Sequence, residues 1–160
     1  MEGNNMKEVK EASVLDVARY VIKRVHPVTT MKLQKLVYYC QAWSLAWDEV
    51  PLFPEDFEAW ANGPVCPELF HKHKGRFRLD NDFLADRPDY PFTDEEKDTM
   101  DRVIKHYKDK SPEWLSALTH TQQPWKMARG NTPIGDPCNT VITKESMMIY
   151  YGGLIDGEAQ

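Results

Sequence analysis

The chain has 160 residues, of which 41% are hydrophobic and 28% charged, and a net charge of −5 at pH 7. This composition is typical of one soluble globular domain; it disfavours non-specific nucleic-acid binding and offers neither a transmembrane helix nor a secretory signal. The three cysteines, Cys40, Cys66 and Cys138, are odd in number and far apart, which favours a reducing, cytoplasmic compartment over a disulfide framework.

Two helices are predicted for the first third of the chain. Ser13 and Asp16 form a capping-box pattern, so the first helix is expected to begin there and to end before Pro27. Thr30 is expected to cap a second, longer helix that runs to about Trp47. Its apolar stripe comprises Leu33, Leu36, Val37, Cys40, Trp43 and Trp47, which predicts a buried thiol at position 40.

The next segment is predicted to contain the β structure. Residues 57–61 alternate as in a half-buried strand, and the Asn-Gly-Pro turn that follows is expected to break it. A proline begins the helix predicted over residues 67–74, and a glycine ends it. Residues 76–79 are predicted to form a short second strand, and residues 80–92 a loop.

Helices are predicted for most of the second half. Thr93 and Glu96 form another capping-box pattern, so a helix is expected to begin there. Its buried face is expected to consist of Met100, Val103, Ile104 and Tyr107. Shorter helices are expected after residue 111, over residues 122–129 and over residues 143–151, the last ended by two glycines.

The fold class is therefore mainly α. We expect a compact helical domain of about six helices with a short two-stranded β element. Residues 13–155 are expected to form this single domain, between a flexible N-terminal lead (1–12) and a flexible tail (156–160).

Charge is spread unevenly along the chain. Residues 17–47 contain five basic side chains and no acidic one, whereas acidic side chains dominate residues 80–101. An acidic surface attracts a basic partner and raises its association rate. The alternative is that the acidic run is only a solvated loop and helix start.

Catalytic and metal-binding motifs are not evident in the sequence. No serine-hydrolase, zinc-protease, phosphate-loop or dinucleotide motif is present, so we expect neither an enzyme nor a cofactor. Cys66, His71 and His73 do not have the spacing of a metal site. A helix-turn-helix over residues 14–47, with Lys32 and Lys35 early in the second helix, is the alternative hypothesis of a DNA-binding regulator.

The segment from Pro51 to Phe70, PLFPEDFEAWANGPVCPELF, is rich in prolines and aromatic residues. Prolines and glycine shape the backbone without regular hydrogen bonding, and aromatic residues supply contact area at low entropic cost. It therefore suits a binding platform, although its rings equally suit core packing. In the downstream segment PWKMARG, Trp125 and Arg129 are candidates for binding an anionic group or, alternatively, for structural roles.

The order PLF-x-E-x-FEAW-x-x-GPV-x-P-x-LF, after the helix KLQKLVYYCQAWSLAW, resembles the SocA-like proteins. These are also called GepA-like phage-associated proteins or Panacea antitoxin domains. The resemblance continues through QQPWKMARG to ITKESMMIYYGGL and covers roughly residues 13–154.

The resemblance implies an antitoxin that binds and neutralises a cognate toxin protein encoded by a neighbouring gene. Toxins of this family include alarmone-synthetase-like enzymes, and one branch of antitoxins delivers its toxin to a ClpXP-type protease. We expect no membrane partner and no nucleic-acid partner. The candidate partner-binding residues are Phe57, Trp60, Gly63, Pro64, Val65, Pro67, Phe70, Asp94, Glu95, Glu96, Asp98, Trp125 and Arg129. The acidic ones are expected to cover a basic toxin face, and Trp60 to anchor the contact.

Overall fold

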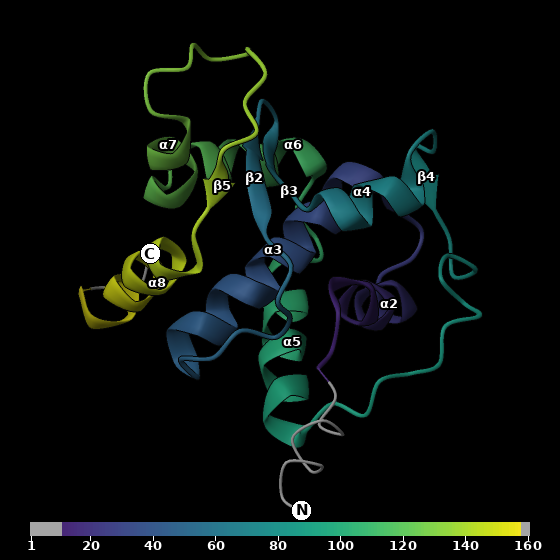
Figure 1. Ribbon diagram of the computed structural model, residues 1–160. Coiled ribbons are helices and arrows are strands. Elements are labelled where there is room, and N and C mark those ends of the chain that lie inside the picture. The colour runs from purple at the N-terminus through teal and green to yellow at the C-terminus, as the bar shows by residue number, and fades with distance from the viewer. Residues whose placement is uncertain (1–10, 158–160) are drawn as a thin grey trace, which may run out of the picture.

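A computed structural model describes residues 11–157 and confirms a mainly α fold (Figure 1). Its elements are α2 (Val14–Arg24), β1 (Val28–Thr29), α3 (Thr30–Trp47), β2 (Phe57–Trp60), β3 (Gly63–Val65), α4 (Pro67–His73), β4 (Arg78–Leu79), α5 (Asp94–Tyr107), α6 (Pro112–His120), α7 (Gln123–Arg129), β5 (Val141–Ile142) and α8 (Lys144–Gly157). The described part thus has seven helices. The expected lead lies mostly outside it, as do the last three residues of the expected tail.

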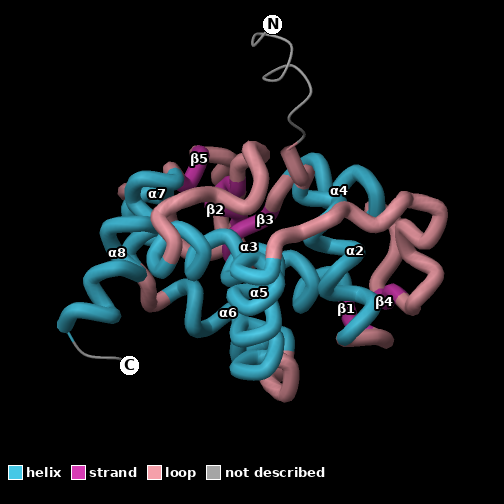
Figure 2. The backbone as a smooth tube through the Cα atoms, turned by 90° about the horizontal axis from the view of Figure 1, so that it is seen from below, coloured by secondary structure: helices cyan, strands magenta, loops and turns pink. Residues whose placement is uncertain are grey.

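Helix α3 runs through the middle of the molecule. It contacts α2, α5, α6, α8 and β3, and Figure 2 shows α8 and α2 on opposite sides of it. Every residue from 33 to 42 is buried. A helix with apolar side chains all round must be covered on all sides, so α3 forms the axis of the core.

The central position of α3 removes the basis of the DNA-binding hypothesis. Lys35 is only 1% exposed, and the Lys32 ammonium donates to the backbone carbonyl of Lys108. A recognition helix must present its first turns to the groove of DNA. Here burial begins at Leu33, and residues 30–32 are only partly exposed.

Two glutamines of α3 attach neighbouring segments to the core. Gln41 accepts from the Leu52 N–H at 2.7 Å and donates to the Phe53 carbonyl at 2.8 Å. Gln34 accepts from the Cys66 N–H at 2.9 Å and donates to the carbonyl of the same residue at 3.3 Å. A side-chain amide offers one acceptor and two donors, so it satisfies buried backbone groups as a neighbouring strand would.

The β structure is more extensive than the sequence indicated. Strands β1 and β4 form a two-stranded antiparallel sheet, and the second sheet has the antiparallel order β3-β2-β5. The strand candidates at 57–61 and 76–79 are confirmed as β2 and β4. The expected break after β2 is instead a hairpin turn into β3, because Ala61-Asn62 reverses the chain and Glu58 then pairs with Val65.

Both capping boxes are confirmed, while two helix boundaries differ from expectation. Ser13 and Thr93 cap α2 and α5 as predicted. The cap of α3 is Thr29 rather than Thr30, since the Thr29 hydroxyl accepts from the Lys32 N–H. Helix α8 continues through both glycines to Gly157. Its packing along α3, which includes Leu154, outweighs a helix penalty of about 1 kcal/mol per glycine.

The described helices share one apolar core. The predicted buried face of α5 and the buried Cys40 are confirmed. Trp47 is the exception to the predicted stripe of α3, because it is 38% exposed at the end of the helix. Within the described residues, no helix is long and apolar enough to span a membrane.

The Gln41 bonds make a testable contribution to stability. Gln41→Leu leaves a buried N–H and a buried carbonyl without partners, at about 1–3 kcal/mol for each. We expect chemical denaturation to show a loss of about 2–4 kcal/mol in the free energy of unfolding. The control Gln123→Leu, at the exposed start of α7, should change it by less than about 0.5 kcal/mol. Equal effects of the two substitutions would contradict this role.

Candidate partner-binding surface

The β2–β3 hairpin is shaped by close backbone approach at Gly63. This glycine has φ +120°, and a Cβ atom there would lie 2.5 Å from Lys35 Cε and 2.9 Å from Thr119 Oγ1. Only glycine adopts this conformation at low cost and leaves room for both neighbours. Gly63, Pro64 and Val65 are buried, so they position the surface rather than form it.

Helix α7 supports the hairpin from behind. The Trp125 indole donates to the Trp60 carbonyl at 2.9 Å, and the Arg129 guanidinium donates to the Ala59 carbonyl at 2.9 Å. Arg129 also donates to two carbonyls in the loop after α7. Trp125 and Arg129 are both buried, and their N–H groups donate the hydrogen bonds just described. The ring of Phe57 is also buried and belongs to the core. The structure therefore places these three candidates in supporting positions.

Trp60 and Phe70 form the accessible part of the platform. Both are half-buried, and their ring centroids lie 5.0 Å apart. The Trp60 indole donates to Glu58 at 2.8 Å, which orients the ring. Trp60 lies between two hollows, one of about 300 Å³ toward α3 and α4 and one of about 640 Å³ toward the loop at residues 135–139. The half-buried Pro67 begins α4 nearby.

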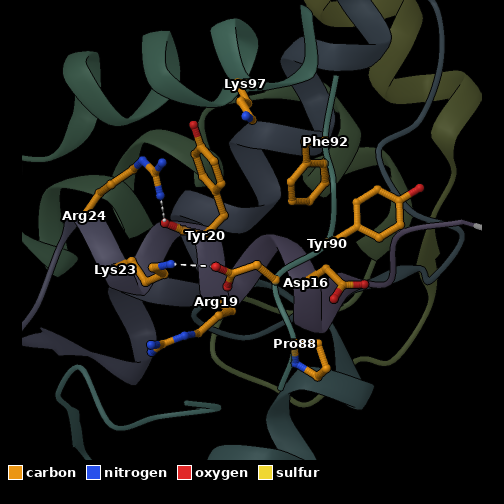
Figure 3. Close-up of a pocket in the computed structure, with 10 residues that line it drawn as sticks. Asp16, Arg19, Tyr20, Lys23, Arg24, Pro88, Tyr90, Phe92 and Lys97 are labelled. Carbon is orange, nitrogen blue, oxygen red and sulfur yellow. Dashed lines mark hydrogen bonds and ion pairs between the residues drawn. The ribbon is translucent and has the colours of Figure 1, made fainter. Parts of the chain in front are cut away.

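The acidic and basic tracts of the sequence meet in the fold. Figure 3 shows the hollow of about 160 Å³ between α2 and the loop that precedes α5. Lys23 pairs with Asp89 at 2.9 Å, and Arg24 lies 3.6 Å from Asp101. Arg19 donates to two carbonyls of the loop. Part of the negative charge that suggested a basic partner is thus compensated within the chain.

The four acidic candidates at the start of α5 divide into two pairs. Glu96 completes the capping box with Thr93, and Asp98 pairs with Arg102 one turn later. Asp94 and Glu95 are exposed and, among the described residues, form no hydrogen bond or ion pair. Figure 1 places the start of α5 at the opposite end of the molecule from the hairpin. The structure therefore does not bring the acidic and aromatic candidates together.

Sequence reasoning missed a buried basic cluster behind the hairpin. Lys35 of α3, His73 of α4 and His120 of α6 lie close enough that Lys35 affects the pKa of both histidines. His73 is buried and lies 3.1 Å from the Gln34 amide. The signal for Lys35 was its place in a helix with apolar residues on every side.

The three cysteines differ in environment, because hydrogen bonds with Thr140 lower the pKa of the half-buried Cys138 thiol, whereas Cys40 and Cys66 are buried. Burial raises the pKa of the Cys66 thiol to about 12, which keeps it protonated and a poor nucleophile. Burial also raises the pKa of Cys40. The described residues contain no group of three His, Cys, Asp or Glu side chains that could hold a metal ion.

A second exposed aromatic surface lies at the other end of α3. Trp43 and Trp47 line an apolar hollow of about 430 Å³ together with side chains of α5 and α8. The Arg102 guanidinium lies 5.3 Å from the centroid of the Trp47 ring. This hollow competes with the hairpin as a docking surface.

The family model for "Antitoxin SocA-like, Panacea domain" matches residues 33–126, more than half of the chain. No curated protein and no solved structure matches the chain. The matched segment runs from the first turns of α3 into α7. It includes both backbone-binding glutamines, the hairpin and the basic cluster.

The pKa of Lys35 makes a prediction about stability. Burial lowers this pKa from 10.5 to about 7, so between these values the unfolded chain holds a proton that the folded chain lacks. The free energy of unfolding should therefore rise with pH, by up to about 1.4 kcal/mol per pH unit. Lys35→Met removes this contribution.

Denaturation of wild type and Lys35→Met from about pH 7.5 to 8.5 measures the effect. We expect the stability of the variant relative to wild type to fall with pH by about 1.4 kcal/mol per unit. Tyrosines and cysteines that titrate at higher pH are present in both proteins, so their contributions cancel in the difference between the two free energies of unfolding. A difference independent of pH would contradict the lowered pKa.

Proposed function

The chain belongs to the family of SocA-like antitoxins with a Panacea domain, and from this premise we propose that it neutralises a cognate toxin protein by direct binding. The toxin is expected to be encoded by a neighbouring gene. We propose binding without turnover as the mechanism, which the burial and raised pKa values of the Cys40 and Cys66 thiols support. The described cysteines are all free, which supports a reducing, cytoplasmic setting.

The observation that carries the proposed docking site is the position of Trp60. Trp60 lines both hollows beside the hairpin, as does its small neighbour Ala61, and it supplies the aromatic side chain that the two hollows share. A half-buried tryptophan beside complementary hollows is typical of an interface hot spot. Trp125 bonds the carbonyl of Trp60, and Arg129 bonds the carbonyl of Ala59 just before it. Because this backbone is already fixed in the free protein, binding costs less conformational entropy.

Neutralisation has two candidate modes within this proposal. Masking leaves the toxin intact in the complex, whereas delivery to a ClpXP-type protease removes it. Following the amount of toxin in cells that also produce this protein separates them, because only delivery makes toxin disappear when the protease is present. The rigid platform favours masking, since preorganised surfaces form long-lived complexes.

Substitution of Trp60 tests the docking site. The neighbouring reading frame is induced in a bacterial host with wild type, Trp60→Ala or Trp47→Ala, and the affinity of each co-purified complex is measured. We expect Trp60→Ala to weaken binding by about 30-fold or more, as for a hot spot worth about 2 kcal/mol, and to lose growth rescue.

Trp47→Ala is the matched control because it removes a tryptophan, more exposed than Trp60, from the other hollow. It should keep affinity and rescue. Thermal unfolding of both variants confirms that they are folded. If Trp47→Ala loses binding and Trp60→Ala keeps it, the toxin docks at the opposite end of α3 and the hairpin site is wrong.

Charge reversal tests the acidic segment separately. Asp94→Lys combined with Glu95→Lys leaves the capping box and the Asp98–Arg102 pair intact. Against a basic toxin, it should slow association by about 3–10-fold at low salt while dissociation changes little, because exposed charges act chiefly on the association rate.

The control for charge reversal is Glu113→Lys combined with Glu145→Lys. These exposed acidic residues lie in the first turns of α6 and α8 and carry the same change of charge. Stopped-flow association at several salt concentrations compares the two. Equal slowing would mean that net charge, not the start of α5, steers the partner.

A further inference from the structure

Lys35 is a buried basic residue without a counter-ion. It is 1% exposed and forms no hydrogen bond or ion pair with any residue that the structure describes. Burial alone accounts for its lowered pKa of about 7, so none of those residues supplies a carboxylate to stabilise its charge. An unpaired buried ammonium is costly, and a methionine would fill the same space without that cost.

Lys35 is among the residues that line the hollow of about 300 Å³ beside the hairpin, which we call the Lys35 cavity, and the end of its side chain lies against Gly63. Its walls are largely apolar: Met31 from α3, Val65 from β3, and the half-buried rings of Trp60 and Phe70. The exposed Asn62 lies on its rim. The cavity thus joins the buried amine to the surface on which Trp60 is expected to act.

The groups that face Lys35 from the packed elements are also basic. Burial, together with the charge of Lys35, lowers the pKa of His73 on α4 and of His120 on α6. Arg129 on α7 acts on His120 in the same direction. The His120 Nε2 atom is buried without a hydrogen-bond partner. Within the described part of the chain, bases therefore surround the site and no acid balances them.

We propose that the Lys35 cavity receives an aspartate or glutamate side chain of the protein partner, with the Lys35 ammonium as its counter-ion. This inference deepens the proposed function and rests on it for the identity of the partner as a toxin. A single carboxylate matches a single cation, whereas a phosphate dianion would need further donors. The apolar walls suit the methylene groups of an acidic side chain.

Proton uptake is the chemical consequence of such binding. Near pH 7 Lys35 is about half neutral, and an adjacent carboxylate favours the charged amine. The amine therefore gains a proton on binding and its pKa rises toward the ordinary value. Burial lowers the pKa of His73 and of His120 in the free protein, so the titration follows the Lys35 signal itself rather than total proton uptake.

The test is an NMR titration of the Lys35 side chain in the full chain, assigned through its backbone signals. The probe is N-acetyl-glutamate N-methylamide, which carries one carboxylate, and its matched control is the neutral glutamine analogue. We expect the acidic probe to raise the pKa of Lys35 by about one unit or more. The glutamine analogue should leave it unchanged, and the exposed lysines serve as internal references. Equal responses to both probes, or none, would overturn the proposal.

The complex with the co-purified neighbour provides the second measurement. In this complex the pKa of Lys35 should be higher than in the free protein. The Lys35→Met variant should stay folded and bind the partner about 10–100-fold more weakly. If the pKa of Lys35 is unchanged in the complex while the toxin is still neutralised, the carboxylate site is wrong and the antitoxin function stands. A response to the acidic probe without growth rescue would support the cavity and contradict the toxin partner.

Discussion

The burial of α3 on all sides is the constraint on which the rest of the structure depends. An all-round apolar helix leaves no face for water, so every neighbouring segment must both cover it and satisfy its own backbone groups. Gln34 and Gln41 solve the second problem, because their amides bond the backbone at Cys66 and at Leu52 and Phe53. The proline-rich segment between these points, which contains β2 and β3, is therefore attached to α3 at both ends.

The candidate binding surface follows from this arrangement. With Cys66 held by Gln34, the chain before it returns as a hairpin over Lys35, and Gly63 allows the close approach. Bonds from Trp125 and Arg129 secure β2, the middle strand of its sheet, which leaves Trp60 at the surface between two hollows. The surface that we expect to meet a partner thus lies over the buried, unpaired Lys35. The burial of this side chain affects the stability of the fold, and the same side chain is the one that we propose to pair with a carboxylate of the partner.

Local signals predicted the parts of the fold that depend on local interactions. Capping boxes located the starts of α2 and α5, and helical spacing gave the buried face of α5. The apolar residues around Lys35 in the sequence were a sign of its burial. The groups that Lys35 and Gln34 meet were not predictable, because they belong to α4, α6 and the hairpin, which are distant in sequence. Strands β1 and β5 have two residues each and exist only through partners far along the chain. Of the candidate site, Trp60 and Phe70 were placed on the surface, whereas Trp125 and Arg129 became its supports.

Docking at the hairpin is tested most directly by hydroxyl-radical footprinting. The oxidation of each tryptophan side chain is measured in the free protein and in its complex with the neighbouring gene product. Trp60, Trp47 and Trp114 all reach solvent on different parts of the surface, so each reports on its own region within one experiment. Docking at the hairpin should protect Trp60 and leave the oxidation of Trp47 and Trp114 unchanged. Protection of Trp47 with Trp60 still reactive would contradict it and assign the toxin to the opposite end of α3.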